Sequence, residues 1–303
     1  MVKLTIPLPL FIVKKAVRRF KEKAQWQDIH RSRAGFEKLT KKSAFESKEC
    51  IYKIIDINHC KAEWVYKESA VNKGVLIYFH GGGYNAGSLN THRTLLTKLA
   101  LESNKRILSL DYRLAPENPY PAALQDAVMA YQWLIDSGIQ PTSIALGGDS
   151  AGGGLTLATL LYLRDHHMPL PSCAITLSPW TDLSMSGDTF LDDTIDEPML
   201  IKEAFSHWAQ NYISNESASL PYISPVFGEL INLCPVYIQV GSAEALLSDS
   251  TRFYEKAHAA GSPVKMDIFK NYFHVFQSFW QILPKAKKAI KMLGDFLNQH
   301  IQD

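Results

Sequence analysis

The residues Gly148-Asp149-Ser150-Ala151-Gly152 place a serine between two glycines in the pattern G-x-S-x-G. An apolar segment precedes this motif and a segment of small and leucine residues follows it, which predicts a strand, a sharp turn and a helix. The start of such a helix directs its amides and dipole at negative charge that develops near the serine Oγ. The motif therefore indicates Ser150 as a nucleophile, with the N–H of Ala151 as a donor to an oxyanion.

A glycine-rich turn between strand and helix could instead cradle a nucleotide phosphate. That function requires the spacing G-x-G-x-x-G or G-x-x-x-x-G-K-[ST], and neither fits residues 147–154. We therefore favour the nucleophile over the phosphate site.

A second glycine motif, His80-Gly81-Gly82-Gly83, directly follows the apolar run 75–79. Bare backbone at the end of a strand can fold over a nucleophile and present N–H donors to an oxyanion. A flexible loop is the alternative, but three glycines beside a buried strand lose much backbone entropy without any gain in packing. We predict an oxyanion hole formed by Gly81, Gly82, Gly83 and Ala151.

A serine nucleophile needs a histidine base, which in folds with the G-x-S-x-G turn comes last in the order nucleophile, acid, histidine. His274 follows the apolar run 265–269, where a loop after a late strand is expected. The other downstream candidates are His207 and His258, which lie within predicted helices, and His300 near the end of the chain. We predict His274 as the base.

The acid should follow the predicted strand 236–241, and two carboxylates are found there, Glu244 and Asp249. Glu244 lies closer to the end of the strand. Asp249 is equally well explained as an N-terminal helix residue that interacts favourably with the helix dipole. We predict Glu244 as the acid and keep Asp249 as the alternative.

The elements that must position these residues alternate along the chain from about residue 75. Short β-branched and aromatic runs alternate with longer segments of helical period, which is typical of an α/β fold with a mostly parallel central sheet flanked by helices. The predicted strands are 75–80, 106–112, 143–148, 174–178, 236–241 and 265–269, and the predicted helices are 91–103, 121–137, 151–164, 249–260 and 284–301.

The alternation is interrupted between residues 183 and 224. A polar stretch, 188–197, is followed by an amphipathic helix near 202–213. We predict an inserted helical cap here, which with an N-terminal cap segment, residues 1–50, could cover the carboxyl ends of the strands. The predicted division is therefore 1–50 as the cap segment and 51–303 as the catalytic domain with a cap insertion at about 183–224.

The N-terminal 50 residues are basic, with 13 of the 32 Lys and Arg residues but only 5 of the 30 Asp and Glu residues. The apolar run 4–13 is short, contains two prolines and is followed by basic residues, so it predicts neither a signal peptide nor a membrane span. The arm could make transient contact with an anionic membrane, but a helical cap with a solvated basic face is the favoured interpretation.

The composition favours a small-molecule partner. A net charge of +2 gives no sign of nucleic-acid binding. The four cysteines have no C-x-x-C spacing, so they predict neither a disulfide framework nor a zinc site. His59 stands beside Cys60, but no spacing in the sequence places three ligands around one ion. We expect a cytoplasmic protein without cofactor or metal, and homodimer formation stays open.

Several longer motifs resemble the hormone-sensitive-lipase-like branch of the α/β-hydrolases, bacterial-type carboxylesterases with H-G-G-G and G-D-S-A-G motifs. The resemblance runs from about residue 60 to 280. Its motifs are His80 to Gly83, Asp111-Tyr112-Arg113-Leu114-Ala115-Pro116-Glu117 with Pro121-Ala122-Ala123 and Asp126, Gly148 to Gly153, Ser178-Pro179-Trp180-Thr181-Asp182-Leu183, and the His274 loop.

This resemblance implies an eight-stranded sheet with a cap, a Ser-acid-His triad, and hydrolysis of short- to medium-chain acyl esters without a cofactor. It implies that the oxyanion donors are mainly Gly82 and Gly83 together with Ala151. Many relatives carry Asp-Pro-Leu where this chain has Glu244-Ala245-Leu246, which aligns the acid with Glu244.

Other functions remain compatible with the same scaffold. An amidase or a deacetylase would use the same residues with a different cap pocket. A ligand receptor without catalysis is disfavoured because both Ser150 and His274 are present. Aromatic residues that could line an acyl pocket, or could equally belong to the core, are Tyr84, Trp180, Phe205, Trp208 and Tyr212.

Overall fold

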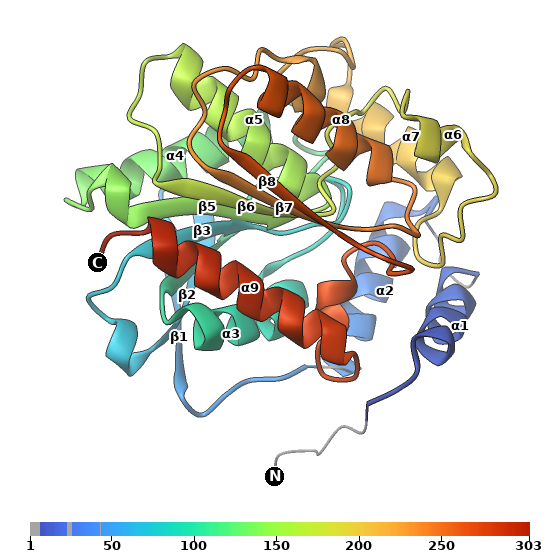
Figure 1. Cartoon of the computed structure of the whole chain (residues 1–303), viewed down its shortest axis with the longest axis horizontal. Coiled ribbons are helices and arrows are strands. Elements are labelled where there is room, and N and C mark those ends of the chain that lie inside the picture. Colours follow the sequence, from blue (N-terminus) through green and yellow to red (C-terminus); the bar gives the residue numbers. More distant parts are fainter. Residues whose placement is uncertain (1–6, 23–25, 43) are drawn as a thin grey trace.

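The computed structural model describes residues 7–22, 26–42 and 44–303, and an eight-stranded sheet crosses the middle of the molecule (Figure 1). The strand order is β1-β2-β4-β3-β5-β6-β7-β8. Strands β3 to β8 run parallel, and the predicted α/β fold with a mostly parallel sheet is confirmed. Their bounds are β3 Val75–Phe79, β4 Arg106–Asp111, β5 Ile144–Asp149, β6 Cys173–Leu177, β7 Val236–Gly241 and β8 Val264–Phe269.

The central strands read as continuous apolar runs because both faces of the sheet are covered. Every residue of β3, β5, β6 and β7 is buried. One face packs against α3 (Leu89–Ser103) and α9 (Pro284–His300), and the other against α4 (Ala122–Asp136), α5 (Ala151–Asp165) and α8 (Leu247–Ala259) (Figure 1). Each of these helices begins within two residues of the predicted position.

The sheet also contains a hairpin whose two strands the local sequence patterns did not locate, although the family resemblance implies eight strands. Strand β1 (Cys50–Ile57) pairs antiparallel with β2 (Cys60–Lys67), and β2 pairs antiparallel with β4. Most of β1 is exposed or half-buried, so its sequence carries charges and no long apolar run. The available signal was the two-residue turn at Asn58 and His59, where Asn58 has a φ of 52°.

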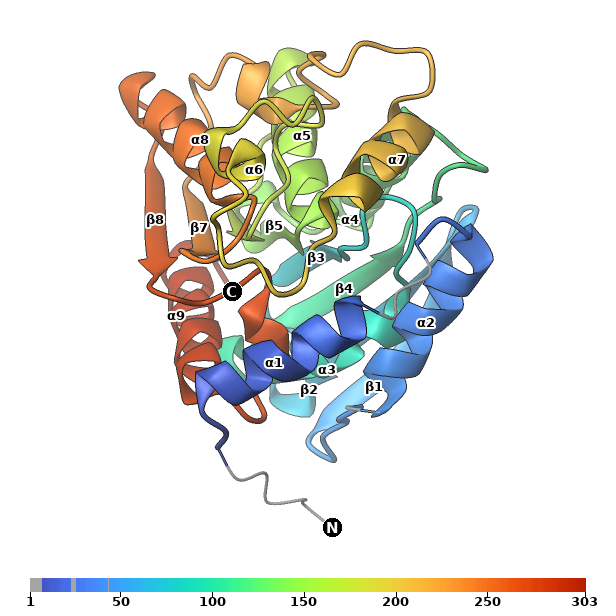
Figure 2. The same cartoon turned by 90° about the vertical axis from the view of Figure 1, so that its right-hand side faces the viewer.

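The cap elements lie over the carboxyl ends of the parallel strands (Figure 2). They are α1 (Leu10–Lys21) and α2 (Ile29–Lys42) from the N-terminal segment, with α6 (Asp188–Leu191) and α7 (Lys202–Ile213) from the predicted insertion. The predicted helix near 202–213 is α7, and the polar stretch 188–197 contains the short α6. The division into a cap segment and a catalytic domain stays a prediction.

Ion pairs join α1 to the insertion. Lys14 and Arg18 both contact Asp196, and Lys21 Nζ donates to the Glu197 carbonyl at 3.3 Å. Among the described helices, none is long and apolar enough to cross a membrane.

Candidate active site

Ser150 lies at the turn between β5 and α5, and its backbone has the unusual angles φ 53° and ψ −122°. Non-glycine residues rarely adopt a positive φ, and the surrounding structure must hold such a conformation in place. The Ser150 N–H donates to the Leu177 carbonyl at 2.9 Å, and the Ser150 carbonyl accepts the N–H groups of Gly154 and Trp180. The turn therefore places the serine at the tip of β5, as G-x-S-x-G predicts.

Glycine at position 152 is required because two backbone segments touch there. A Cβ on Gly152 would lie 2.0 Å from the Phe79 carbonyl oxygen at the end of β3. A Cβ on Gly148 would lie 2.3 Å from the Gly152 carbonyl oxygen. The two glycines of the motif thus allow the first turn of α5 to pack directly against β3, beside the second glycine motif.

The loop after β3 presents two N–H groups that no other part of the described chain uses. Gly82 and Gly83 adopt φ values of 124° and 65°, and their N–H groups make no hydrogen bond to another described residue. The same holds for the N–H of Ala151 at the start of α5. These donors come from the loop and the helix that meet beside Ser150, as an oxyanion hole requires.

Gly81 differs from its neighbours, because its N–H donates to Asp149 Oδ1 at 3.2 Å. Asp149 also accepts the Tyr78 hydroxyl at 2.9 Å, and its Oδ2 lies 3.2 Å from His92 Nε2. Burial opposes the ionisation of Asp149, but the charge and hydrogen bond of His92 and the bond from Tyr78 outweigh it and lower the pKa of Asp149. Asp149 therefore anchors the glycine loop to the serine turn, and the Gly81 N–H is not available to substrate.

His80 is fully buried under this loop and stacks on Tyr112, with ring centroids 4.3 Å apart. Burial lowers the pKa of His80 to about 3, so the ring is neutral at ordinary pH. It packs the loop and leaves the role of base to another histidine.

His274 and Glu244 form a buried hydrogen-bonded pair at the ends of β8 and β7. His274 Nδ1 lies 3.0 Å from Glu244 Oε2, and Glu244 Oε1 accepts the Gly241 N–H at 3.0 Å. Both side chains are almost fully buried, at 3% and 0% exposure. An ionised carboxylate can only accept a hydrogen bond, so in this pair the imidazole proton of His274 lies on Nδ1. Nε2 can then accept a proton from a nucleophile.

Two hydrogen bonds, one to a side chain and one between backbone groups, connect the His274 loop to the serine turn through the end of β6. Val275 N–H donates to Ser178 Oγ at 3.2 Å, just beyond the end of β6. The residue before Ser178 is Leu177, whose carbonyl accepts the Ser150 N–H. The ends of β5, β6 and β8 are thus tied together on the side of the sheet that the cap covers.

Asp249, the alternative acid, lies in α8 and binds a different part of the chain. Its Oδ2 accepts the N–H groups of Thr181 and Asp182 at 2.7 and 2.8 Å. Burial and the nearby charge of Asp182 raise the pKa of Asp249 to about 8. No hydrogen bond joins it to His274 among the described residues.

The remaining histidines lie away from this pair. His207 is on α7 near the ring of Trp26, His258 is on α8 against Tyr254, and His300 Nδ1 bonds the Phe296 carbonyl. Two carboxylates of the family-like motifs form ion pairs, Asp126 with Arg113 and Asp182 with Arg252.

Four of the five aromatic residues considered for an acyl pocket belong to the core. Tyr84, Trp180, Phe205 and Tyr212 are at most 1% exposed, and the rings of Tyr84 and Tyr212 stack with centroids 3.8 Å apart. Trp208 on α7 differs, because it is half-buried and lies over the glycine loop. A Cβ on Gly83 would be 2.6 Å from Trp208 Cε3.

One expectation about metal ligands needs correction. The sequence spacing places no third ligand near His59 and Cys60, but the fold brings Asp126 to them, with the three ligand atoms within 4.8 Å of one another. Asp126 comes from α4, which no local pattern connects to the β1–β2 turn. Its carboxylate already binds the Arg113 guanidinium at 2.8 Å, and burial raises the pKa of the Cys60 thiol to about 12, so this group does not favour a cation.

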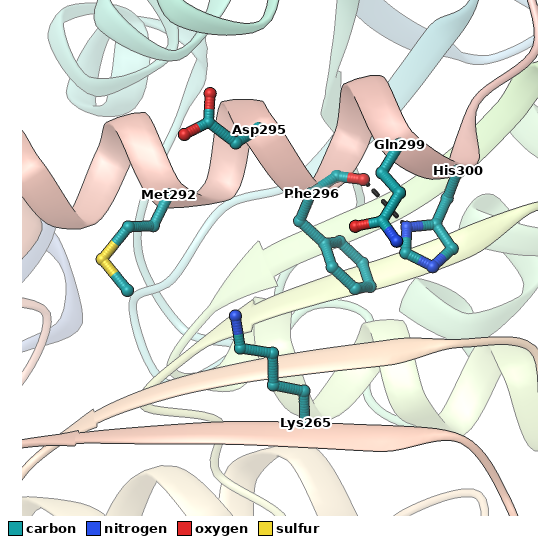
Figure 3. A pocket seen from close by; sticks show the side chains of 6 residues that line it. All are labelled: Lys265, Met292, Asp295, Phe296, Gln299 and His300. Atoms are coloured by element: carbon teal, nitrogen blue, oxygen red, sulfur yellow. Dashed lines mark hydrogen bonds between the residues drawn. The ribbon is translucent and has the colours of Figure 1, made fainter.

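Two surface hollows lie outside the hydrogen-bonded site. The first, of about 370 Å³, lies between β8 and α9 and is lined by residues that include Lys265, Phe296 and His300 (Figure 3). The second, of about 490 Å³, lies beside α1 and reaches Glu197 of the insertion. Neither contains a residue of the predicted site.

Sequence reasoning missed the two residues that anchor the glycine loop, Asp149 and His92. Asp149 stands inside the G-x-S-x-G motif, so its position offered a signal. His92 offered none, because its contact with Asp149 spans 57 residues of sequence.

Comparison with known proteins gives a consistent result. Residues 76–278 match a protein family described as having the alpha/beta hydrolase fold. An acetyl-hydrolase of Streptomyces hygroscopicus is 38% identical over 80% of this chain and 81% of its own length, and an esterase of Acinetobacter venetianus is 36% identical over 76% of each chain.

Solved structures agree in fold as well as in sequence. The crystal structure of an esterase from the bacterial hormone-sensitive lipase family has a TM-score of 0.93 and 37% identity, covering 97% of this chain and 98% of the other. A crystal structure of the protein EstE5, soaked with p-nitrophenyl butyrate, has a TM-score of 0.89 and 37% identity, covering 95% and 97%.

Proposed function

The chain belongs to the hormone-sensitive-lipase-like branch of the α/β-hydrolase fold family, and we propose that Ser150, Glu244 and His274 carry out the carboxylic ester hydrolysis typical of it. The observation that carries this proposal is the buried hydrogen bond between His274 Nδ1 and Glu244 Oε2. It supports the sequence-based choice of Glu244 over Asp249.

In the proposed acylation, His274 Nε2 takes the proton of the Ser150 hydroxyl while Oγ attacks the ester carbonyl carbon. The carbonyl oxygen becomes an oxyanion, which the N–H groups of Gly82, Gly83 and Ala151 stabilise. The tetrahedral intermediate collapses, the bond to the alcohol oxygen breaks, and His274 returns the proton to the leaving alcohol. Glu244 stabilises the imidazolium that forms in between.

Deacylation repeats the sequence with water. His274 removes a proton from water as its oxygen attacks the acyl-enzyme carbonyl, and the same three N–H groups hold the second oxyanion. Its collapse returns the proton to Ser150 Oγ and releases the carboxylic acid. The free enzyme is regenerated without any cofactor.

We assign a preference for short- to medium-chain acyl groups. The support is the position of Trp208, whose indole lies against Gly83 of the glycine loop and so restricts the space beside the oxyanion donors. The acetyl-hydrolase name of one relative and the p-nitrophenyl butyrate soak of another are in line with a small acyl group.

The test is hydrolysis of p-nitrophenyl esters from acetate to palmitate by the wild type and Ser150→Ala, with an anilide of the best acyl group as the amide substrate. We expect activity on the shorter esters, none with Ser150→Ala, and stoichiometric labelling of Ser150 by a phosphonate, located by mass spectrometry. A folded wild type that is inert on all esters but cleaves the anilide would make the chain an amidase. Full activity of Ser150→Ala would refute the nucleophile.

We further propose that α1 makes transient contact with anionic membranes. Val13 and Val17 pack this helix onto the protein, yet its outer side exposes Phe11 at 71% and Ile12 at 42%. The basic residues Lys15 and Arg19 are exposed on the same helix, so apolar insertion and attraction to anionic headgroups would act together.

Sedimentation with vesicles tests this contact. Binding to vesicles that contain phosphatidylglycerol, loss of binding to pure phosphatidylcholine, and loss in Phe11→Ser would support it. Equal sedimentation of wild type and Phe11→Ser would refute it.

We also keep the cytoplasm as the proposed location, because all four cysteines are free thiols and all are buried. Homodimer formation stays open, and analytical ultracentrifugation can decide it.

A further inference from the structure

Glu197 of the cap insertion is buried beside the proposed acid of the triad. It lies between α6 and α7 with 9% of its surface exposed. Its Oε1 accepts the N–H groups of Met199 and Leu200 at 2.6 and 3.1 Å, and its Oε2 accepts the Ala245 N–H at 3.2 Å. One carboxylate therefore joins a turn of the cap to the residue that directly follows Glu244.

This contact fixes the peptide group between Glu244 and Ala245. The Glu244 side chain has two partners of its own, the Gly241 N–H and His274 Nδ1, both at 3.0 Å. A hydrogen bond of that length tolerates little displacement of the backbone that carries the carboxylate. The placement of the acid against His274 thus depends on a side chain from the cap.

The charge of Glu197 is directed at the same pair. Burial, with a smaller contribution from Glu244, raises the pKa of Glu197 above its usual value, although the charge of His274 and the hydrogen bonds from Met199 and Leu200 act against this rise. The cations on the α1 side do not bind its carboxylate directly, because Lys21 donates to the Glu197 backbone carbonyl and Lys14 contacts Asp196. The charge of Lys14 nevertheless acts on Glu197 from the α1 side, and the charge of His274 acts on it from the catalytic side.

We propose that Glu197 is a positioning residue for ester hydrolysis, which holds the Glu244 peptide in place from the cap and adds a second negative charge near the His274 imidazolium. This inference rests on the proposed triad. The reaction makes His274 positive in both steps, so a fixed negative charge nearby stabilises the transition states more than the free enzyme. The cap then acts on the chemistry as well as on access to the site.

A purely structural role for Glu197 would predict something different. If it only closed the turn at Met199 and Leu200, its replacement would lower stability and leave the titration of His274 unchanged. The pH dependence of kcat/KM separates the two roles, because its acidic limb reports the base of the free enzyme.

The experiment compares Glu197→Gln, which removes the charge at nearly constant shape, with Glu197→Asp, which keeps it on a shorter side chain. Glu63→Gln is the matched control, since Glu63 is also buried but pairs with Arg93 across β2 and α3. Each variant is assayed on p-nitrophenyl butyrate between pH 5 and 9, with the folded fraction measured by circular dichroism and active sites counted by phosphonate titration.

For Glu197→Gln we expect kcat to fall about 10- to 100-fold, as for other groups that orient a catalytic residue, with little change in KM. The acidic limb of kcat/KM should move to lower pH by about 0.5 to 1 unit, because the imidazolium loses a stabilising charge. For Glu197→Asp the limb should stay at the wild-type position even where kcat falls. Glu63→Gln should keep both kcat and the limb.

The proposal is overturned if Glu197→Gln changes only thermal stability, or if its acidic limb coincides with that of the wild type. Should Glu197→Gln not fold, Glu197→Asp provides the test. A shift of its acidic limb away from the wild-type position would overturn the role of the charge. Failure of the triad itself is distinguishable, because Glu244→Gln would then hydrolyse the ester at the wild-type rate whatever Glu197 does.

Discussion

Replacing Glu244 by glutamine should remove most of the ester hydrolysis while leaving the fold intact. The side chain keeps its length, so the contact of Oε1 with the Gly241 N–H at 3.0 Å can persist. The contact with His274 Nδ1 changes in kind, because an amide can present either a donor or an acceptor there. The amide also cannot stabilise the imidazolium by charge.

The magnitude follows from the two roles of the carboxylate. Loss of the correct imidazole tautomer and of the charge on the acid costs about 10⁴-fold in kcat in a well-studied serine protease triad. At 1.36 kcal/mol for each tenfold change, this corresponds to about 5 kcal/mol of transition-state stabilisation. We expect a loss of about 10³- to 10⁴-fold here, because the Glu244–His274 pair is similarly buried.

The matched control is Asp249→Asn, which alters a buried carboxylate in the next helix. Its carbonyl oxygen can still accept from Thr181 and Asp182, so kcat for each folded molecule should stay within about threefold of the wild type. The assay is p-nitrophenyl butyrate hydrolysis, normalised to active sites. A Glu244→Gln enzyme within tenfold of the wild type, beside an inactive but folded Asp249→Asn enzyme, would refute the assignment.

Three other perturbations test separate parts of the site. Gly83→Ala should lower kcat by about 10²-fold or more with a smaller change in KM, because the added Cβ would strain a φ of 65° and displace Trp208 from the glycine loop that carries the proposed oxyanion donors. Steady-state kinetics on one ester checks this. Trp208→Ala should shift the best p-nitrophenyl ester toward longer acyl chains, and an unchanged chain-length profile would contradict its role in selectivity. The third test uses chemical denaturation. The fold raises the pKa of Asp249 from its usual 3.8 to about 8. The protonated carboxyl therefore stabilises the folded state fully below pH 3.8, and this stabilisation is lost as the pH rises toward 8. Asp249→Asn should therefore gain in unfolding free energy relative to the wild type between pH 5 and pH 9, and a constant difference would show that Asp249 does not hold the proton.

The parts of the site that sequence patterns predicted are those dictated by local sterics. A serine at a positive φ needs glycines at Gly148 and Gly152, since backbone atoms approach within 2.0 to 2.3 Å of where a Cβ would be. The loop after β3 likewise needs glycine at Gly82 and Gly83, where its backbone has a positive φ. Such requirements leave a short motif in the sequence, and the buried strands before each motif leave an apolar run.

The errors occurred where exposure removed the pattern or where a contact joins distant residues. Strand β1 lacks an apolar run because much of it faces solvent, so the hairpin with β2 was missed. The hydrogen bond from the Gly81 N–H to Asp149, 68 residues away, was likewise not predicted. The group formed by His59, Cys60 and Asp126 has the same origin, since α4 brings in the third residue.

The sequence by itself determined the α/β fold, the sharp turn at Ser150, the glycine loop and the position of His274 after a late strand. Only the tertiary structure decided which group each of three carboxylates binds. Glu244, Asp249 and Glu197 all lie within or near predicted helix starts or cap segments, so local sequence does not distinguish their partners. Their hydrogen bonds, to His274, to Thr181 and to Ala245, depend on side-chain and backbone positions set by packing between elements. A one-dimensional pattern records the local conformation of each segment but not the partner that the fold places beside it.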